Sequence, residues 1–330
     1  MIRVENVTAQ YQTITGPVVS VKDVSFKIYD NEIFGIAGES GCGKSTLLKT
    51  LYDNLQYPLQ LKDGRIVFEY EDQEGGTKTL QSGKIKGGWW KAVSYIPQAA
   101  MSVLNPVYRI DEQFYELLRR HKKNYRRAEM KERVCQYIKD MNLSVDVLSA
   151  YPHQLSGGMR QRVVIAMACF LQPNVILADE PTTALDVVVQ KSILLMLMEQ
   201  QKKMKNTLVI VSHDMGVHYQ ITNRMGIMYS GNLVEVGPTE DIFKEPLHPY
   251  TQMLIGALPK IGDKSVRQGV EGRPPSLRTP PPGCRFAPRC KKACPECSKS
   301  VPELKEILPG RYAACHLLHK SEKERSTDAE

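Results

Sequence analysis

The sequence predicts an α/β fold with a parallel-sheet core, an antiparallel β subdomain, a helical subdomain and a small cysteine-rich C-terminal extension. Three observations predict it. Apolar runs at 33–37 and 174–180 are each followed, after a short loop, by a helix-forming segment, as in parallel sheets with crossover helices. Residues 110–150 carry apolar positions at helical spacing. Five of the eight cysteines lie between residues 284 and 315.

Length and composition indicate two units of a globular protein. At 330 residues the chain exceeds the roughly 250 residues at which single cores stop growing. We therefore expect a main domain at 1–260, with its helical subdomain at about 100–165, and an extension at 261–330. No apolar run approaches the roughly 20 residues that span a bilayer, and the first residues do not form a signal peptide. We expect a cytosolic chain.

The formal charge of +8 raises the question of an anionic partner. The basic residues are scattered, apart from clusters at 119–123 and 202–205. Nucleic acid or anionic lipid could bind such clusters, but a solvated helix face is the better interpretation of both. We expect no nucleic-acid partner.

A glycine-rich loop with the pattern G-x-x-x-x-G-K-[ST] follows the run at 33–37. Its glycines let the backbone turn tightly, so that successive N–H groups and the start of the next helix point at phosphate oxygens. Lys44 would add a cation for the outer phosphates, and the Ser45 hydroxyl would hold Mg²⁺. The flanking strand and helix argue against a turn that binds nothing. We assign nucleotide binding to Gly38, Ser40, Gly41, Cys42, Gly43, Lys44, Ser45 and Thr46.

The first 30 residues alternate apolar and polar positions and predict two half-buried antiparallel strands. Tyr11 lies between the two alternating runs. Its ring could stack on adenine, because an aromatic face binds any base, although a loop tyrosine can also be surface packing. Residues 57–91 predict a second β-rich segment.

Gln98 ends a short apolar strand that begins at Val93. A glutamine carbonyl there can ligate Mg²⁺ or orient a water molecule. After the helical insertion, Ser156, Gly157 and Gly158 precede a predicted helix at 163–171. A helix start with free N–H groups is a second anion site, although the serine and glycines could serve only as a cap and turn.

Two further strands end in polar side chains. The run at 174–180 ends in Asp179 and Glu180, where Asp179 can hold Mg²⁺ and Glu180 can polarise an attacking water. The run at 207–214 delivers His213, which can donate to a γ-phosphate or to that water. Asp186 precedes a predicted helix at 187–203.

These motifs, in this order, resemble those of the ATP-binding subunits of ABC transporters over roughly residues 1–260. In that family two subunits close head to tail, with ATP between the loop of one and the equivalent of Ser156-Gly157-Gly158 in the other. The resemblance rests on 38–46, Gln98, 155–162, 177–180, 184–186 and His213.

The resemblance implies an ATPase whose turnover is intact. Lys44 and Ser45 would bind phosphate and Mg²⁺, with Gln98 sensing the site. Glu180 would be the catalytic base and His213 the γ-phosphate contact. A regulatory switch without turnover would fit better with a replaced Glu180 or His213, and both are retained.

Residues 104–110 and 246–259 are similar to the oligopeptide/dipeptide importer branch. This implies a peripheral protein at the cytoplasmic face of the membrane, with two transmembrane permease subunits, an extracytoplasmic solute-binding protein and a second, homologous ATPase subunit in a heterodimer. Some members of the branch carry oligosaccharides or nickel. A soluble ABC ATPase of DNA repair or translation is a further alternative, but the chain lacks the long coiled-coil insertion or second cassette that it would need.

Beyond a proline-rich linker at 273–282, the extension holds five cysteines. In a reducing cytosol this clustering favours metal ligation over disulfides. The frame resembles the C-terminal extension of the peptide-importer branch, which implies that Cys284, Cys290, Cys297 and Cys315 hold a [4Fe–4S] cluster and leaves Cys294 over. The C-x₂-C spacing of Cys294 and Cys297 keeps zinc open, and free thiols are a third possibility.

Overall fold

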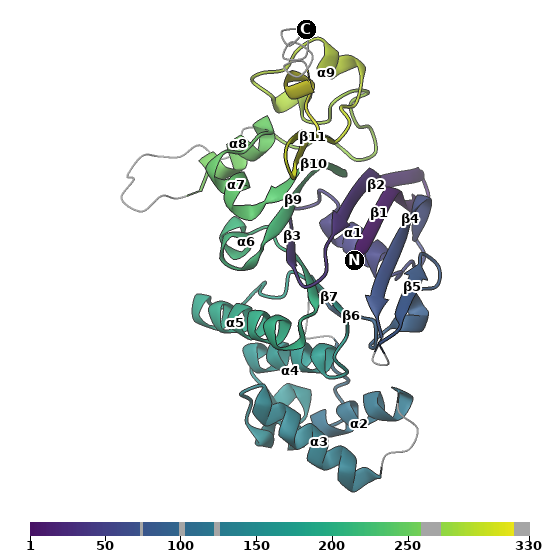
Figure 1. Cartoon of the computed structure of the whole chain (residues 1–330), viewed down its shortest axis with the longest axis vertical. Helices are drawn as coiled ribbons and strands as arrows, with labels where there is room; N and C mark the ends of the chain where they lie inside the picture. Colours follow the sequence, from purple (N-terminus) through teal and green to yellow (C-terminus); the bar gives the residue numbers. More distant parts are fainter. Residues whose placement is uncertain (73–74, 99–102, 122–125, 259–271, 320–330) are drawn as a thin grey trace. The chain divides into compact units, whose positions relative to one another are not determined.

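The computed structural model describes residues 1–72, 75–98, 103–121, 126–258 and 272–319 (Figure 1). They form two compact units. The first is built from the described parts of 1–87 and 209–330, and the second from those of 88–208. The division after Leu208 falls within strand β8 (Thr207–Val211). The sequence-based boundaries at 100, 165 and 260 stay predictions.

The first unit contains a four-stranded antiparallel sheet (Figure 1). Apolar residues such as Ile2, Val4 and Ile28 are buried, while polar residues between them stay partly exposed. This confirms the predicted β-rich segments at 1–30 and 57–91. In the order β2-β1-β4-β5, the strands are Gly16–Ile28, Ile2–Thr13, Leu59–Glu71 and Thr77–Gln81.

The main sheet of the first unit runs in the order β11-β12-β10-β9-β3-β8. Strand β3 pairs in parallel with β9, and β12 pairs with β10 through Tyr312 and Val236, so the described C-terminal residues continue the sheet. Every residue of β3 and β8 is buried, because helices cover such crossover strands. The strands other than β8 are β3 (Ile33–Ala37), β9 (Arg224–Tyr229), β10 (Asn232–Pro238), β11 (Lys305–Leu308) and β12 (Arg311–Ala313). The helices are α1 (Lys44–Leu51), α6 (Met215–Ile221), α7 (Thr239–Lys244), α8 (Pro249–Gly256), η5 (Ala287–Arg289) and α9 (Glu296–Lys299).

The second unit combines the parallel pair β6–β7 with helices. Apolar side chains of α2 at Ile110, Phe114 and Leu118 are buried, which confirms the predicted helical insertion. The helix predicted at 163–171 begins earlier, at Gly157, because the Ser156 hydroxyl caps it by accepting from Met159 N. The elements are β6 (Val93–Ile96), α2 (Ile110–His121), α3 (Arg127–Asp140), η3 (Val145–Ser149), η4 (Pro152–Gln154), α4 (Gly157–Cys169), β7 (Val175–Asp179) and α5 (Val187–Met204), with η1 (Ile85–Gly88) at the entry to the unit.

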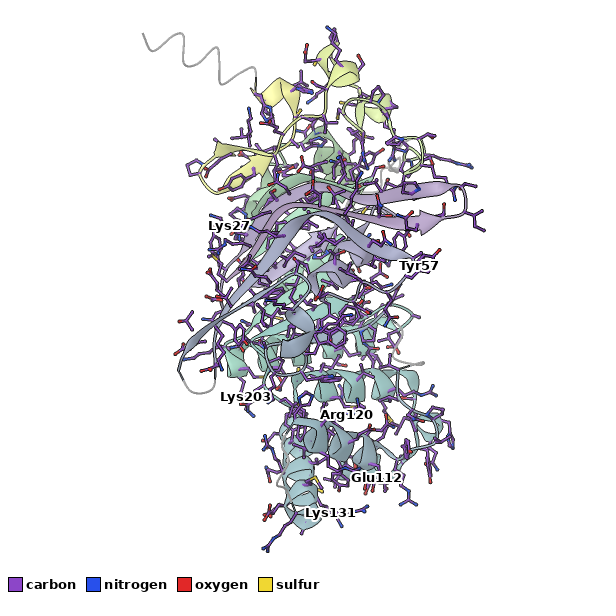
Figure 2. The ribbon with its side chains drawn as sticks, turned by 90° about the vertical axis from the view of Figure 1, so that its right-hand side faces the viewer. Lys27, Tyr57, Glu112, Arg120, Lys131 and Lys203 are labelled. Atoms are coloured by element: carbon purple, nitrogen blue, oxygen red, sulfur yellow. The ribbon has the colours of Figure 1, made fainter. Side chains whose placement is uncertain are left out.

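The described basic clusters lie on helix surfaces of the second unit, where Figure 2 labels Arg120 and Lys203. Arg120 pairs with Glu116 over 2.7 Å, and Lys203 lies 3.9 Å from Asp140. These contacts support the interpretation of both clusters as solvated helix faces. Within the described ranges, no helix has the length and apolar character needed to cross a bilayer.

Candidate nucleotide site

The predicted phosphate loop connects β3 to α1 in the first unit. Gly38 and Gly43 have positive φ angles of 149° and 106°. An added Cβ at Gly38 would lie 2.2 Å from the Met228 carbonyl oxygen, and one at Gly43 would lie 2.2 Å from that of Ser20. Both positions therefore require glycine, for conformation and for space. The result is a tight loop whose amides lead into the start of α1.

Lys44 opens α1 and is buried. Its ammonium group donates to the carbonyl oxygens of Gly38 over 2.8 Å and Glu39 over 2.9 Å. Tyr11, the predicted adenine contact, lies in β1. Its hydroxyl lies 3.2 Å from Thr46 Oγ1, so β1 contacts the first turn of α1. The structure thus brings Tyr11 and the loop residues together.

Two residues that sequence reasoning missed hold the same loop. The Arg289 guanidinium forms a two-point ion pair with the Glu39 carboxylate, and Glu39 N donates to the Tyr250 hydroxyl over 3.1 Å. Neither residue belongs to a local motif that includes Glu39. Only packing could have revealed them.

In the second unit, β7 delivers two carboxylates. Asp179 is 2% exposed and accepts from the Tyr95 hydroxyl over 2.9 Å. Glu180 follows with a φ of 45°, an unusual value for a non-glycine residue and one that is enriched at functional sites. Its Oε2 accepts from Gln98 Nε2 over 3.0 Å and from Thr183 Oγ1 over 2.7 Å. Gln98 and Glu180, predicted separately, thus form one group, to which the structure adds Tyr95 and Thr183.

Ser156, Gly157 and Gly158 begin α4, and Ser156 is exposed. An added Cβ at Gly158 would lie 2.7 Å from Val189 Cγ1, so close packing against α5 requires this glycine. The Asp186 carboxylate caps α5 by accepting from the N–H groups of Val188 and Val189. Both predicted helix starts are therefore present, one in each unit.

His213 lies just after β8 and is exposed. The nearby His218 on α6 is fully buried against Gly35, where an added Cβ would lie 2.5 Å from His218 Nδ1. Burial lowers the pKa of His218 to about 4, so that it stays neutral at pH 7. His213 is thus the solvent-exposed histidine of the two.

The five C-terminal thiols come together in the first unit. Cys294 Sγ lies 3.5 Å from Cys297 Sγ, and Cys284 N donates to the Cys297 carbonyl over 2.8 Å. Burial raises the pKa of the Cys284, Cys290, Cys297 and Cys315 thiols, and neighbouring cysteines raise it further. Among the residues that the structure describes, however, no three His, Cys, Asp or Glu side chains are arranged as ligands of a metal ion.

The fold and the loop between β3 and α1 define a P-loop ATPase of the ABC class. The sequence profile of the ABC transporter family matches residues 21–183, and that of the oligopeptide/dipeptide transporter C-terminal region matches residues 234–297. A bacterial ABC transporter cassette solved as a dimer is 26% identical, with a TM-score of 0.61 over 72% of this chain and 99% of that one.

Two relatives define the family more closely. The dipeptide transport ATP-binding protein DppD of Bacillus subtilis (strain 168) is 39% identical over 85% of this chain and 83% of its own length. The oligopeptide transport ATP-binding protein OppD of the same organism is 34% identical over 85% of this chain and 78% of its own length. The chain belongs to the family of ATP-binding subunits of dipeptide and oligopeptide ABC transporters, ATPases that power peptide import.

Proposed function

We propose that this chain hydrolyses ATP at the cytoplasmic face of a membrane to drive uptake of dipeptides or oligopeptides. It would work with two permease subunits, an extracytoplasmic solute-binding protein and a second, homologous ATPase subunit. The observation that carries the proposal is that one chain presents two helix starts suited to phosphate, at Lys44 and at the exposed Ser156. A composite site shared between two subunits uses both.

Within each ATP site, we assign the loop residues 38–46 to the phosphates and Tyr11 to the adenine. Ser45, Gln98 and Asp179 would hold Mg²⁺, which neutralises phosphate charge when bound; a hydroxyl, an amide carbonyl and a carboxylate fit its preference for oxygen. Glu180 would orient and deprotonate the attacking water, with His213 contacting the γ-phosphate. The hydrogen bonds from Gln98 and Thr183 to Glu180 support this role, because they orient its carboxylate.

Exposed apolar side chains support the proposed assembly. Val187 and Val188, directly after the Asp186 cap, are each 79% exposed at the start of α5. They suit a contact with a partner ATPase subunit. Val107 and Tyr108, before α2, are 72% and 50% exposed and suit a contact with a permease subunit.

We further propose that Cys284, Cys290, Cys297 and Cys315 hold a [4Fe–4S] cluster. The grouping of the five thiols supports it, since four thiolates are the usual ligand set. Zinc is the alternative: the 3.5 Å between the Cys294 and Cys297 sulfurs is close to the roughly 3.8 Å expected for two thiolates on one zinc ion at a Zn–S distance of about 2.3 Å.

The proposed function is tested by purifying the chain from native membranes and assaying the complex for ATPase activity. We expect two polytopic subunits and a second ATPase, with turnover stimulated by binding protein loaded with peptide. Stimulation only by binding protein loaded with an oligosaccharide or nickel would show that this solute, and not a peptide, is the cargo. Recovery with ribosomes or nucleic acid and no membrane subunit would overturn the transport role.

A further inference from the structure

A side chain of the cysteine-bearing segment holds the phosphate loop. Arg289 donates from Nη1 to Glu39 Oε2 over 2.8 Å and from Nη2 to Oε1 over 3.0 Å. The Arg289 side chain is 4% exposed and that of Glu39 is 24% exposed, so the pair is largely shielded from water. A two-point contact between planar groups fixes orientation as well as distance. It therefore constrains Glu39, the second residue of the loop.

The backbone of Glu39 passes this constraint to Lys44. Its carbonyl oxygen accepts from Lys44 Nζ over 2.9 Å, and its N–H donates to the Tyr250 hydroxyl over 3.1 Å. The side-chain carboxylate, the backbone N–H and the backbone carbonyl of Glu39 therefore all form hydrogen bonds. A shift of the Glu39 side chain would move the carbonyl on which the Lys44 ammonium rests.

Arg289 is itself fixed by an aromatic cluster. Its Nη1 also donates to the Tyr229 hydroxyl over 3.1 Å, and its backbone N–H donates to the Phe286 carbonyl over 3.0 Å. The buried Phe286 ring packs against Tyr229 and Tyr250, with ring centres 5.2 Å and 5.4 Å apart. The hydrogen bond to Glu39 raises the pKa of Arg289 further, so it stays charged. These contacts hold the Arg289 guanidinium in one position.

We propose that Arg289 is a positioning residue for nucleotide binding. It holds Glu39, and through Glu39 the loop and Lys44, in the arrangement that receives the phosphates. It thereby couples the cysteine-bearing segment, whose Cys290 is its neighbour in sequence, to ATP affinity. This inference rests on the proposed ATP site at 38–46.

The test measures ATP binding to the full-length chain, and KM and kcat in the assembled complex. We expect Arg289→Gln to weaken ATP binding and raise KM roughly tenfold, with kcat changed less than about twofold, since about one charge-assisted hydrogen bond of positioning is lost. Glu39→Gln should have the same effect. The double variant should bind ATP no more weakly than the weaker-binding of the two single variants, because both substitutions act through one contact. Arg289→Lys should recover part of the affinity through a single hydrogen bond.

Arg224→Gln is the matched control. It breaks a partly buried pair in the same unit, with Arg224 Nη1 3.0 Å from Glu32 Oε1. The other described partners of Arg224 lie outside the loop and are Lys27, Tyr29 and Phe34. The substitution should lower thermal stability and leave ATP affinity unchanged. Equal weakening by Arg224→Gln, or wild-type affinity in Arg289→Gln, would overturn the inference.

Lys44→Ala distinguishes a failure of the proposed ATP site from a failure of the role proposed for Arg289. Loss of ATP binding in this variant supports the site at 38–46, and the inference is then judged by Arg289→Gln alone. Wild-type binding by Lys44→Ala would remove the proposed ATP site itself.

Discussion

The side-chain amide of Gln98 donates to the carboxylate of Glu180, with Nε2 and Oε2 3.0 Å apart. These residues follow the neighbouring parallel strands β6 and β7, whose carboxyl ends lie at the same edge of the sheet. The contact orients the Glu180 carboxylate at this edge of the sheet. Glu180 is therefore the first residue to substitute in a test of ATP hydrolysis.

Glu180→Gln should lower ATP turnover by about 100-fold or more while ATP binding persists, because an amide cannot accept the water's proton. Steady-state phosphate release and equilibrium ATP binding measure the two effects, and ATP should trap a closed dimer that size analysis detects. Glu129→Gln, on the exposed start of α3, is the matched control and should turn over normally. Unchanged turnover in Glu180→Gln would remove this residue from the catalytic role.

Gly158→Ala should impair turnover several-fold without unfolding the chain. The added methyl would meet Val189 Cγ1 at 2.7 Å and push the start of α4 away from α5. Adding Val189→Ala makes room, so the double variant should regain most of the activity. ATPase assays with circular dichroism as a folding control measure this, and a double variant no better than the single would show that crowding against Val189 is not the cause.

Stability should fall as the pH drops below about 6.5. His248 is fully buried, its Nδ1 accepts from Tyr250 N, and burial lowers its pKa to about 3. The unfolded chain binds the proton near pH 6.5 and the folded chain does not, so each pH unit lost below 6.5 costs about 1.4 kcal/mol for this residue.

Urea unfolding at pH 7.5, 6.5 and 5.5 measures this slope. His248→Gln should be less stable at pH 7.5 but should lose less stability on acidification than the wild type. The exposed His153 provides the control, since His153→Gln should keep the wild-type slope. Equal slopes in wild type and His248→Gln would contradict the assignment.

Cys297→Ser should abolish bound iron and the visible absorbance at about 400 nm in protein purified without oxygen. Cys294→Ser should keep both, although its sulfur lies 3.5 Å from that of Cys297. Cys135→Ser, outside the cysteine group, controls for general effects. Iron analysis and spectroscopy measure the outcome, and bound zinc without iron in the wild type would replace the cluster by a zinc site.

The local motifs could be predicted because short-range physics sets them. Glycine at 38 and 43 reflects positive φ angles, and the buried runs of β3 and β7 follow from apolar composition alone. The start of α4 was misplaced by six residues, at Val163 instead of Gly157, because two glycines weaken helix propensity. The Ser156 cap outweighs that weakness.

By itself, the sequence determined the class of fold, the order of the motifs and the residue types at the phosphate loop, since these depend on neighbours a few positions apart. Only the tertiary structure decided which distant side chains meet. Gln98 and Glu180 are 82 residues apart, and Glu39 and Arg289 are 250 apart. The physical reason is that such contacts depend on how the intervening chain packs, and local propensities carry no record of that packing.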